Sequence, residues 1–377
     1  MALRYAMLSA DLLDARMQAW PLLTACWLLG CGPGSTEPAP SDAGTEGSTS
    51  SISSTAADDT GPEPTSTSGE ASSSSESGST TGGPGPVYDD VYPLDVTYPE
   101  GGAFDPTDEV FYVGTLEGGA VQRVDPLTGD SDLLFAPTER GTWMTLGMAV
   151  DETRRRLWVC AANRDTEPFT GQLWMFDLSR GAREQTIPLS AGEEAAWCED
   201  VAVASDGTAY ATDRENPNIY RADAGFVAEL LVTDKALGSP LLGQNGVIVL
   251  PGDEALIAAI HAPPQLNHVT IANGTVTPVV IDGEFTDTGL GTGADGMVYV
   301  DGVLLVVFDG KLAQLTPTSD DWSTADSVMV ELPRGLTDVL STPQGLYLLN
   351  GQAIQFALGQ DPLGPFELSK FVGKFAP

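Results

Sequence analysis

Four short turns carry oxygen-bearing side chains of the kind that bind hard cations. In chain order they are Pro99-Glu100-Gly101-Gly102, Cys198-Glu199-Asp200-Val201, Gln244-Asn245-Gly246 and Ala294-Asp295-Gly296. Carboxylate and amide oxygens are the ligands that Ca²⁺ and similar divalent cations prefer, with water completing the coordination shell. Such a cation polarises a carbonyl and acidifies a bound water, and Asp295 or Asp200 would then act as catalytic base. The alternative is that the Glu-Gly, Asn-Gly and Asp-Gly pairs in these sequences simply turn the chain between strands.

Short β-strands are the elements that must bring these turns together. From Val87 onward no helical period persists, whereas β-rich runs bounded by Gly, Pro, Asp and Asn follow one another. A similar unit returns six times, at positions 104, 148, 200, 246, 296 and 337. A spacing of about 40–50 residues is typical of a four-stranded propeller blade. We therefore expect residues 87–377 to form an all-β, six-bladed β-propeller rather than a sandwich, with Val87–Thr97 or Phe366–Phe375 closing the ring.

Three of the four turns resemble motifs of the SMP-30/gluconolactonase/luciferin-regenerating family. That family has Glu in E-G-P before the first strand, Asn in S-N-G-L and Asp in P-D-G-M. Glu100, Asn245 and Asp295 match these three in order, and the resemblance covers residues 98–310. It implies a propeller whose channel holds a divalent cation of the Ca²⁺ kind on these residues. It also implies a hydrolase that acts on a small lactone or ester.

The third-blade motif departs from the family, which has Asn-Asp there and often an Arg two residues before the Asn. Glu199-Asp200 and Trp197 stand at those positions, and Gln244 replaces a small residue of the second motif. Glu199 and Trp197 are therefore the candidates for substrate binding. The cation ligands match the family better than the substrate contacts do. The alternative function is a non-catalytic propeller that binds a protein or glycan partner.

The first 86 residues have the composition of an export signal followed by a tether. Residues 1–30 contain Arg4 and Arg16 and end in a 12-residue apolar run, which is long enough for a signal peptide but too short to span a bilayer. The sequence Leu28-Leu29-Gly30-Cys31 resembles the lipobox of bacterial lipoproteins, which implies lipidation of Cys31. Residues 31–86 are rich in Ser, Thr, Gly and Pro, and we expect a disordered tether. The resemblance implies a protein of the cell envelope, lipid-anchored to the outer membrane.

The net charge of the chain and the closed ring of strands limit which further partners the protein can bind. The formal net charge of −36 repels nucleic acid and anionic lipid, so the lipid anchor is the only membrane contact we expect. A closed ring leaves few free strand edges, and a monomer is therefore the default. We expect the basic run Arg154–Arg156 to lie in a solvated turn.

The remaining chemistry-bearing residues are few. His261 and His268 lie on either side of a Pro-Pro pair, as an acid/base device or as hydrogen-bonded bystanders. Cys160 and Cys198 belong to adjacent predicted blades, where export permits a disulfide. Two buried thiols are the alternative. A catalytic thiol is disfavoured because neither cysteine has a clear His partner in the sequence.

Overall fold

The structure is a computed structural model that describes residues 88–136, 142–166, 168–190, 195–286 and 293–375. The predicted signal peptide (1–30), Cys31 and the predicted tether (31–86) lie outside this part of the chain. Among the residues described, no helix is both long enough and apolar enough to cross a membrane.

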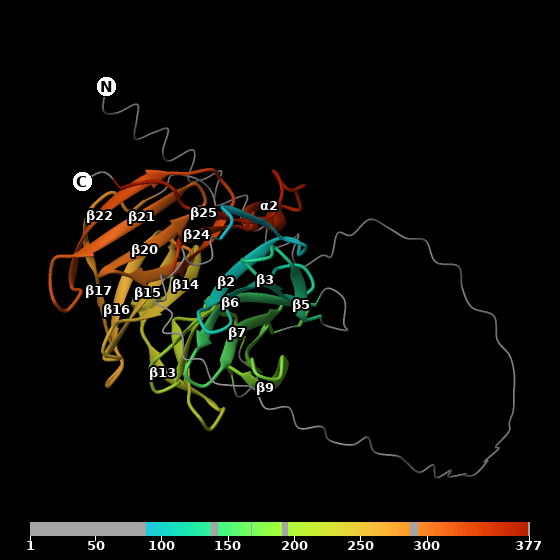
Figure 1. Ribbon diagram of the computed structural model, residues 1–377. Helices are drawn as coiled ribbons and strands as arrows, with labels where there is room; N and C mark the ends of the chain where they lie inside the picture. The colour runs from blue at the N-terminus through green and yellow to red at the C-terminus, as the bar shows by residue number, and fades with distance from the viewer. Residues whose placement is uncertain (1–87, 137–141, 167, 191–194, 287–292, 376–377) are drawn as a thin grey trace, which may run out of the picture. The chain divides into compact units, whose positions relative to one another are not determined.

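Six sheets, each with four antiparallel strands, follow one another around a ring, which confirms the six-bladed propeller (Figure 1). Blade 1 contains β2 (Pro99–Asp105), β3 (Val110–Thr115), β4 (Val121–Val124) and β5 (Ser131–Phe135). Blade 2 contains β6 (Trp143–Asp151), β7 (Arg156–Asn163), β8 (Thr170–Asp177) and β9 (Ala182–Pro188). Blade 3 contains β10 (Cys198–Val203), β11 (Ala209–Asp213), β12 (Asn218–Ala222) and β13 (Ala228–Thr233). Blade 4 contains β14 (Leu242–Val249), β15 (Ala255–Ala262), β16 (Gln265–Thr270) and β17 (Thr275–Pro278), and the 3₁₀ turn η1 (Lys235–Leu237) precedes it.

Blade 5 has one strand more than the sequence predicts. Its four antiparallel strands are β19 (Met297–Val300), β20 (Val303–Phe308), β21 (Lys311–Pro317) and β22 (Thr324–Glu331). A fifth strand, β18 (Val280–Gly283), pairs in parallel with β22 at the outer edge. The chain that leaves blade 4 thus covers the edge of blade 5, where β22 would otherwise present unpaired backbone groups.

The two ends of the propeller chain meet in blade 6. This blade contains β23 (Leu336–Thr342), β24 (Gly345–Asn350), β25 (Glu367–Lys370) and, outermost, β1 (Val91–Pro93). Strand β1 pairs antiparallel with β25, and Val91 lies opposite Ser369. Both segments proposed for closing the ring therefore take part. A short helix, α2 (Ala353–Leu358), lies in the connection between β24 and β25.

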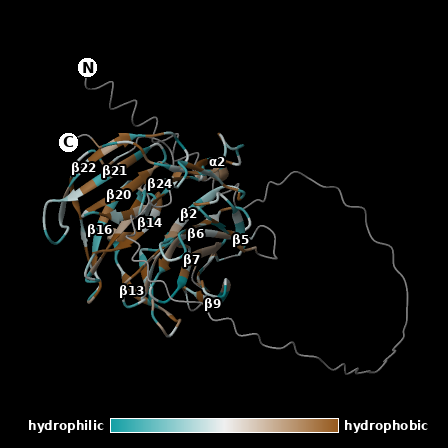
Figure 2. Ribbon diagram, in the orientation of Figure 1, coloured by the Kyte–Doolittle hydropathy of each residue, from teal (hydrophilic) through white to brown (hydrophobic). Residues whose placement is uncertain are grey.

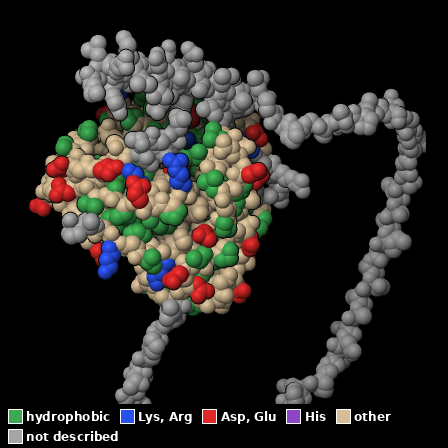
Figure 3. All heavy atoms as spheres, turned by 90° about the horizontal axis from the view of Figure 1, so that it is seen from above, with side chains coloured by type: hydrophobic (Ala, Val, Ile, Leu, Met, Phe, Trp, Pro, Cys, Tyr) green, Lys and Arg blue, Asp and Glu red, His purple; other side chains and the backbone are tan. Residues whose placement is uncertain are grey.

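Apolar strand residues fill the space within and between the blades. The largest buried side chains include Trp158 and Trp174 of blade 2 and Phe308 of blade 5. Figure 2 shows these strands as mainly hydrophobic and the turns as mainly hydrophilic. On the face shown in Figure 3, acidic side chains are scattered among other residues and do not form one patch.

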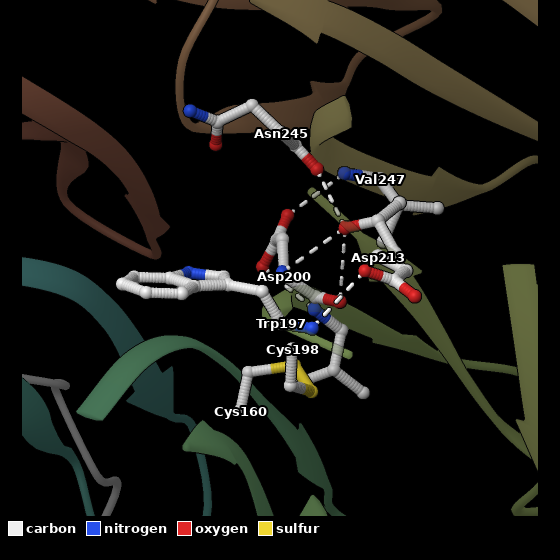
Figure 4. Close-up of a disulfide and its surroundings, with 9 residues drawn as sticks. Cys160, Trp197, Cys198, Asp200, Asp213, Asn245 and Val247 are labelled. Atoms are coloured by element: carbon white, nitrogen blue, oxygen red, sulfur yellow. Dashed lines mark hydrogen bonds between the residues drawn. A yellow bond between two sulfur atoms is a disulfide. The ribbon is translucent and has the colours of Figure 1, made fainter. Parts of the chain in front are cut away.

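Two covalent or ionic links join neighbouring blades. Cys160 of β7 and Cys198 of β10 form a disulfide with a Cα–Cα distance of 5.0 Å, so these cysteines are not free thiols (Figure 4). Arg155, in the turn after β6, binds Asp105 of blade 1 through two contacts of 2.7 Å. Asp105 is fully buried. The expectation of a solvated turn is therefore wrong for Arg155, because its guanidinium neutralises a carboxylate buried in the neighbouring blade.

Candidate cation site

A repeated irregularity of the innermost strands turns side chains toward the channel. The pairing of the first two strands shifts register by a β-bulge in five blades, at Pro99/Gly102, Thr145/Met148, Cys198/Val201, Gln244/Val247 and Leu336/Asp338. A bulge leaves one residue outside the ladder and re-aims its side chain. Glu100, Glu199 and Asn245 all lie within these bulges. In blade 5, Asp295 comes just before β19, and its backbone N–H donates to Val307.

All four predicted turns meet at one small cavity in the channel. Glu100, Glu199, Asp200, Asn245 and Asp295 line this cavity, together with Gly101, Gly147, Gly296, Thr337 and Asp338 from the other innermost strands. All six blades therefore contribute. The cavity measures about 10 Å³ on the scale used for buried waters, which is room for about one water molecule or one ion.

Asp200 and Asp338 are built into the ring as ties between blades. Asp200 accepts the N–H of Val201 and, across the blade boundary, the N–H of Val247, both at 2.8 Å (Figure 4). Asp338 accepts Val339 N–H at 2.7 Å and Gly102 N–H of blade 1 at 2.8 Å. Each carboxylate thus links its own strand to the next blade. Each oxygen of these two carboxylates accepts one backbone N–H, so about half of their acceptor sites are used in joining the blades.

Two glycines make room for these ties. A Cβ atom at Gly147 would lie 1.9 Å from Oδ1 of Asp200, and one at Gly296 would lie 2.1 Å from Oδ1 of Asp338. Any side chain at either position would displace the carboxylate. The Gly-Asp pairing occurs twice, in blades 2 and 3 and again in blades 5 and 6. Asp338 was missed in the sequence because it is not part of any of the turns that resemble the family motifs.

Burial and mutual repulsion raise the pKa values of the carboxylates around the cavity. Burial is the main cause for Glu100 and Asp295, and the neighbouring carboxylates add to it, so both pKa values lie well above the ordinary range. Burial also raises the pKa of Asp338 well above its usual range and that of Asp200 to about 7. It raises the pKa of Glu199 as well, although Arg214 opposes the shift. Protons or cations must therefore balance this cluster at neutral pH.

Two buried carboxylate oxygens at the cavity have no hydrogen-bond partner within the described chain. They are Oε2 of Glu199, which is 2% exposed, and Oδ1 of Asp295, which is 9% exposed. Buried oxygens of this kind are costly unless a proton, a cation or a water satisfies them. As the side chains stand, however, no three His, Cys, Asp or Glu residues of the described ranges converge on one point as ready-made metal ligands.

The side-chain amide of Asn245 is hydrogen-bonded to a histidine of the next strand. Its Nδ2 lies 3.1 Å from Nδ1 of His261, and Thr212 Oγ1 donates to its backbone carbonyl at 2.8 Å. The contact uses the nitrogen of the amide and leaves the other end of the group for a ligand. His268 lies on β16, the third strand of the blade, away from the channel. The two histidines therefore do not form an acid/base pair.

Arg214 is a site residue that sequence analysis did not identify. Its Nη1 donates to Oε1 of Glu199 at 3.2 Å, and its guanidinium carbon lies 5.7 Å from the Trp197 ring centroid. Burial works against its charge, but Glu199 and other carboxylates outweigh this effect and raise its pKa. The only signal in the sequence is a basic residue directly after Asp213, at the channel end of a second strand. Trp197 itself is 7% exposed and packs edge-on against Phe169.

Comparisons with known proteins identify the fold. No protein-family model matches the sequence, and no curated protein sequence matches it either. Mala s 1, the major allergen of Malassezia sympodialis, matches in structure with a TM-score of 0.60 and 19% identity, over 75% of this chain and 96% of that one. A regucalcin from Agrobacterium tumefaciens, described as a calcium-binding protein, matches with a TM-score of 0.50 and 14% identity, over 77% and 97%. At these identities the likeness concerns the fold alone, and the chain is a β-propeller with an acidic cluster in its channel.

Proposed function

We propose that this protein binds a divalent cation of the Ca²⁺ kind in the channel of its propeller. One observation carries the proposal: two buried carboxylate oxygens that have no partner among the described residues, on Glu199 and Asp295, belong to residues that line a cavity the size of one ion. Carboxylate and amide oxygens form a hard donor set, which suits Ca²⁺ better than softer metals. The description of the structurally similar regucalcin as calcium-binding agrees with this choice.

Glu100, Asn245 and Asp295 are the proposed ligands, from blades 1, 4 and 5. Glu100 is 7% exposed and lies in a bulge, and His261 holds the nitrogen end of the Asn245 amide. These side chains surround the cavity rather than converging on a single point, so small rotations and water molecules would complete the coordination.

Hydrolysis of a lactone or ester is the reaction that we propose for this site. When bound, a divalent cation supplies a Lewis acid that polarises a carbonyl oxygen. Of the two predicted bases, Asp295 is the better one, because its Oδ1 has no partner among the described residues. Both oxygens of Asp200 instead accept backbone N–H groups. Glu199 lines the cavity and is the proposed substrate contact there, whereas Trp197 is buried and does not line the cavity.

Cation content of the purified full-length protein tests the binding proposal. We expect about one Ca²⁺ per chain by elemental analysis, and loss of at least ten-fold in affinity for both Glu100→Gln and Asp295→Asn, since each removes a charged ligand. Asp132→Asn is the matched control, because Asp132 is exposed on blade 1 and pairs only with Arg123 there. Absence of the ion, or an affinity indifferent to both changes, would refute the site and favour a propeller that binds a protein or glycan.

We also propose that a lipid on Cys31 anchors the propeller in the cell envelope, at the outer membrane, through the 31–86 tether. The support is the apolar run and the lipobox-like sequence that ends at Cys31. In a bacterial host, the wild-type protein should sediment with membranes, and Cys31→Ser should release it to the soluble fraction. A wild-type protein found only in the soluble fraction contradicts this proposal without affecting the cation site.

A further inference from the structure

The acidic cluster contains one internal cation, the guanidinium of Arg214. Its side chain is 30% exposed, whereas its partner Glu199 is 2% exposed. The buried end of the ion pair is therefore the carboxylate, and the arginine is its more exposed partner. Such an arrangement compensates a charge that would otherwise be costly to bury.

The loop that carries Arg214 is rigidly built. Asp213 is fully buried and accepts the backbone N–H groups of Trp197, Glu215 and Asn216. Gln244 of the next blade places its Nε2 within 2.8–3.1 Å of three carbonyl oxygens of residues 213–218. The backbone of Arg214 is thus fixed, and only its side chain is free to move.

Glu199 presents one oxygen to Arg214 and the other to the cavity, so two positions for a cation share its single negative charge. Its Oε1 binds Arg214, and its Oε2 is a buried oxygen at the cavity without a partner in the described chain. A cation in the cavity would attract Glu199 and repel the guanidinium. From these contacts we infer that Arg214 is the built-in counter-ion of the channel site and competes with the bound cation for Glu199. Arg214 thereby sets the cation affinity, an inference that rests on the proposed cation site.

The competition predicts that a mutation beside the binding site increases the affinity for Ca²⁺ instead of decreasing it. Removing the positive charge should tighten Ca²⁺ binding, because it removes both a repulsion and a rival for Glu199. We expect Arg214→Gln, which keeps a donor for Glu199, to bind Ca²⁺ at least ten-fold more tightly than wild type by calorimetric titration. Arg214→Lys keeps the charge and should stay within about three-fold of wild type. An arginine that merely supported the fold would give the opposite sign for Arg214→Gln.

A surface arginine of the same blade provides the matched control. Arg221 pairs with Glu229 at the exposed edge of blade 3, so Arg221→Gln should leave the affinity unchanged. Thermal unfolding in chelator verifies that each variant is folded. If wild type binds Ca²⁺ and Arg214→Gln binds it equally or more weakly, the counter-ion role is wrong and the cation site stands. If neither wild type nor Arg214→Gln binds Ca²⁺, the cation site and the competition both fall. Tight binding seen only in Arg214→Gln would support the competition but refute cation binding by the wild-type protein, which is the proposed function.

Discussion

In the presence of chelator, the protein should unfold at a lower temperature at pH 8 than at pH 5.5. Folding raises the pKa values of Glu100, Asp295 and Asp338 by burial and mutual repulsion, and that of Asp200 to about 7. A raised folded-state pKa contributes stability below the unfolded value, near 4, and this stability is lost as pH rises through the folded value. Each proton that only the folded state holds changes stability by about 1.4 kcal/mol per pH unit.

A divalent cation should reverse this loss, because it replaces the protons. Ca²⁺ at about 100 times its dissociation constant would add about 2.7 kcal/mol, or about 5–10 °C, at pH 8. The gain should shrink toward pH 5.5, where protons occupy the cluster. Arg214, Glu215 and His261 are ionisable groups near it, and Arg214 keeps its charge throughout this range. Calorimetric scans at both pH values, each with and without Ca²⁺, measure the unfolding temperature under the four conditions.

Glu100→Gln serves as the control, since it removes one of the coupled acids. Its unfolding temperature in chelator should change less between the two pH values than that of wild type. If the metal-free stability of the wild-type protein stays constant or increases from pH 5.5 to pH 8, ionisation of the cluster does not destabilise the folded state. The pKa shifts that burial causes would then be wrong in direction.

The second large effect concerns the tie formed by Asp338. Asp338→Ala leaves the N–H groups of Val339 and Gly102 without their acceptor at the boundary between blades 6 and 1. Each buried donor without a partner costs about 1–3 kcal/mol, so we expect a loss of about 2–5 kcal/mol in the free energy of unfolding. Relief of the repulsion among the carboxylates offsets part of this loss. Denaturant titration at pH 6 measures the difference.

The equivalent change in blade 3 tests whether the two ties act alike. Asp200→Ala removes the same pair of contacts at Val201 and Val247, and a loss of similar size is expected. The exposed Asp132→Asn should stay within about 0.5 kcal/mol of wild type. If both alanine variants are as stable as wild type, repulsion in the channel outweighs the hydrogen bonds. The two aspartates would then be present for a ligand rather than for the ring.

The ring could be predicted from the sequence because its signal is periodic. The apolar strand units return at a blade-like spacing, and every predicted first strand carries or directly follows its marker position. The additional strand β18 was missed because a parallel edge strand depends on where the chain from blade 4 comes to lie, and local composition does not encode that. The pairing of Cys160 with Cys198 depended in the same way on distances between blades.

The candidate site could be predicted only where residues stand in recognisable turns. Glu100, Glu199, Asn245 and Asp295 were found because each belongs to a short Gly- or Asp-containing motif in the sequence. Only Asp295 comes before its innermost strand as expected, whereas the other three lie in bulges inside β2, β10 and β14. Arg214 escaped notice because it follows the end of a second strand, and the antiparallel pairing of β10 with β11 brings it to Glu199. The separate role of Asp200 as a tie likewise depends on the N–H of Val247, which lies in the next blade.

The pairing of β1 with β25 has a consequence for the order in which the molecule can form. Strand β1 precedes the rest of the propeller in the chain, yet its one sheet partner among the described strands, β25, is synthesised after the five intervening blades. During translation β1 has no strand to pair with until five complete blades have emerged, and blade 1 meanwhile lacks its neighbour on one side. Ring closure is therefore a late, long-range event, and a nascent chain exposes the apolar flanks of blades 1 and 5 until then. Capture by chaperones would be most useful in that interval.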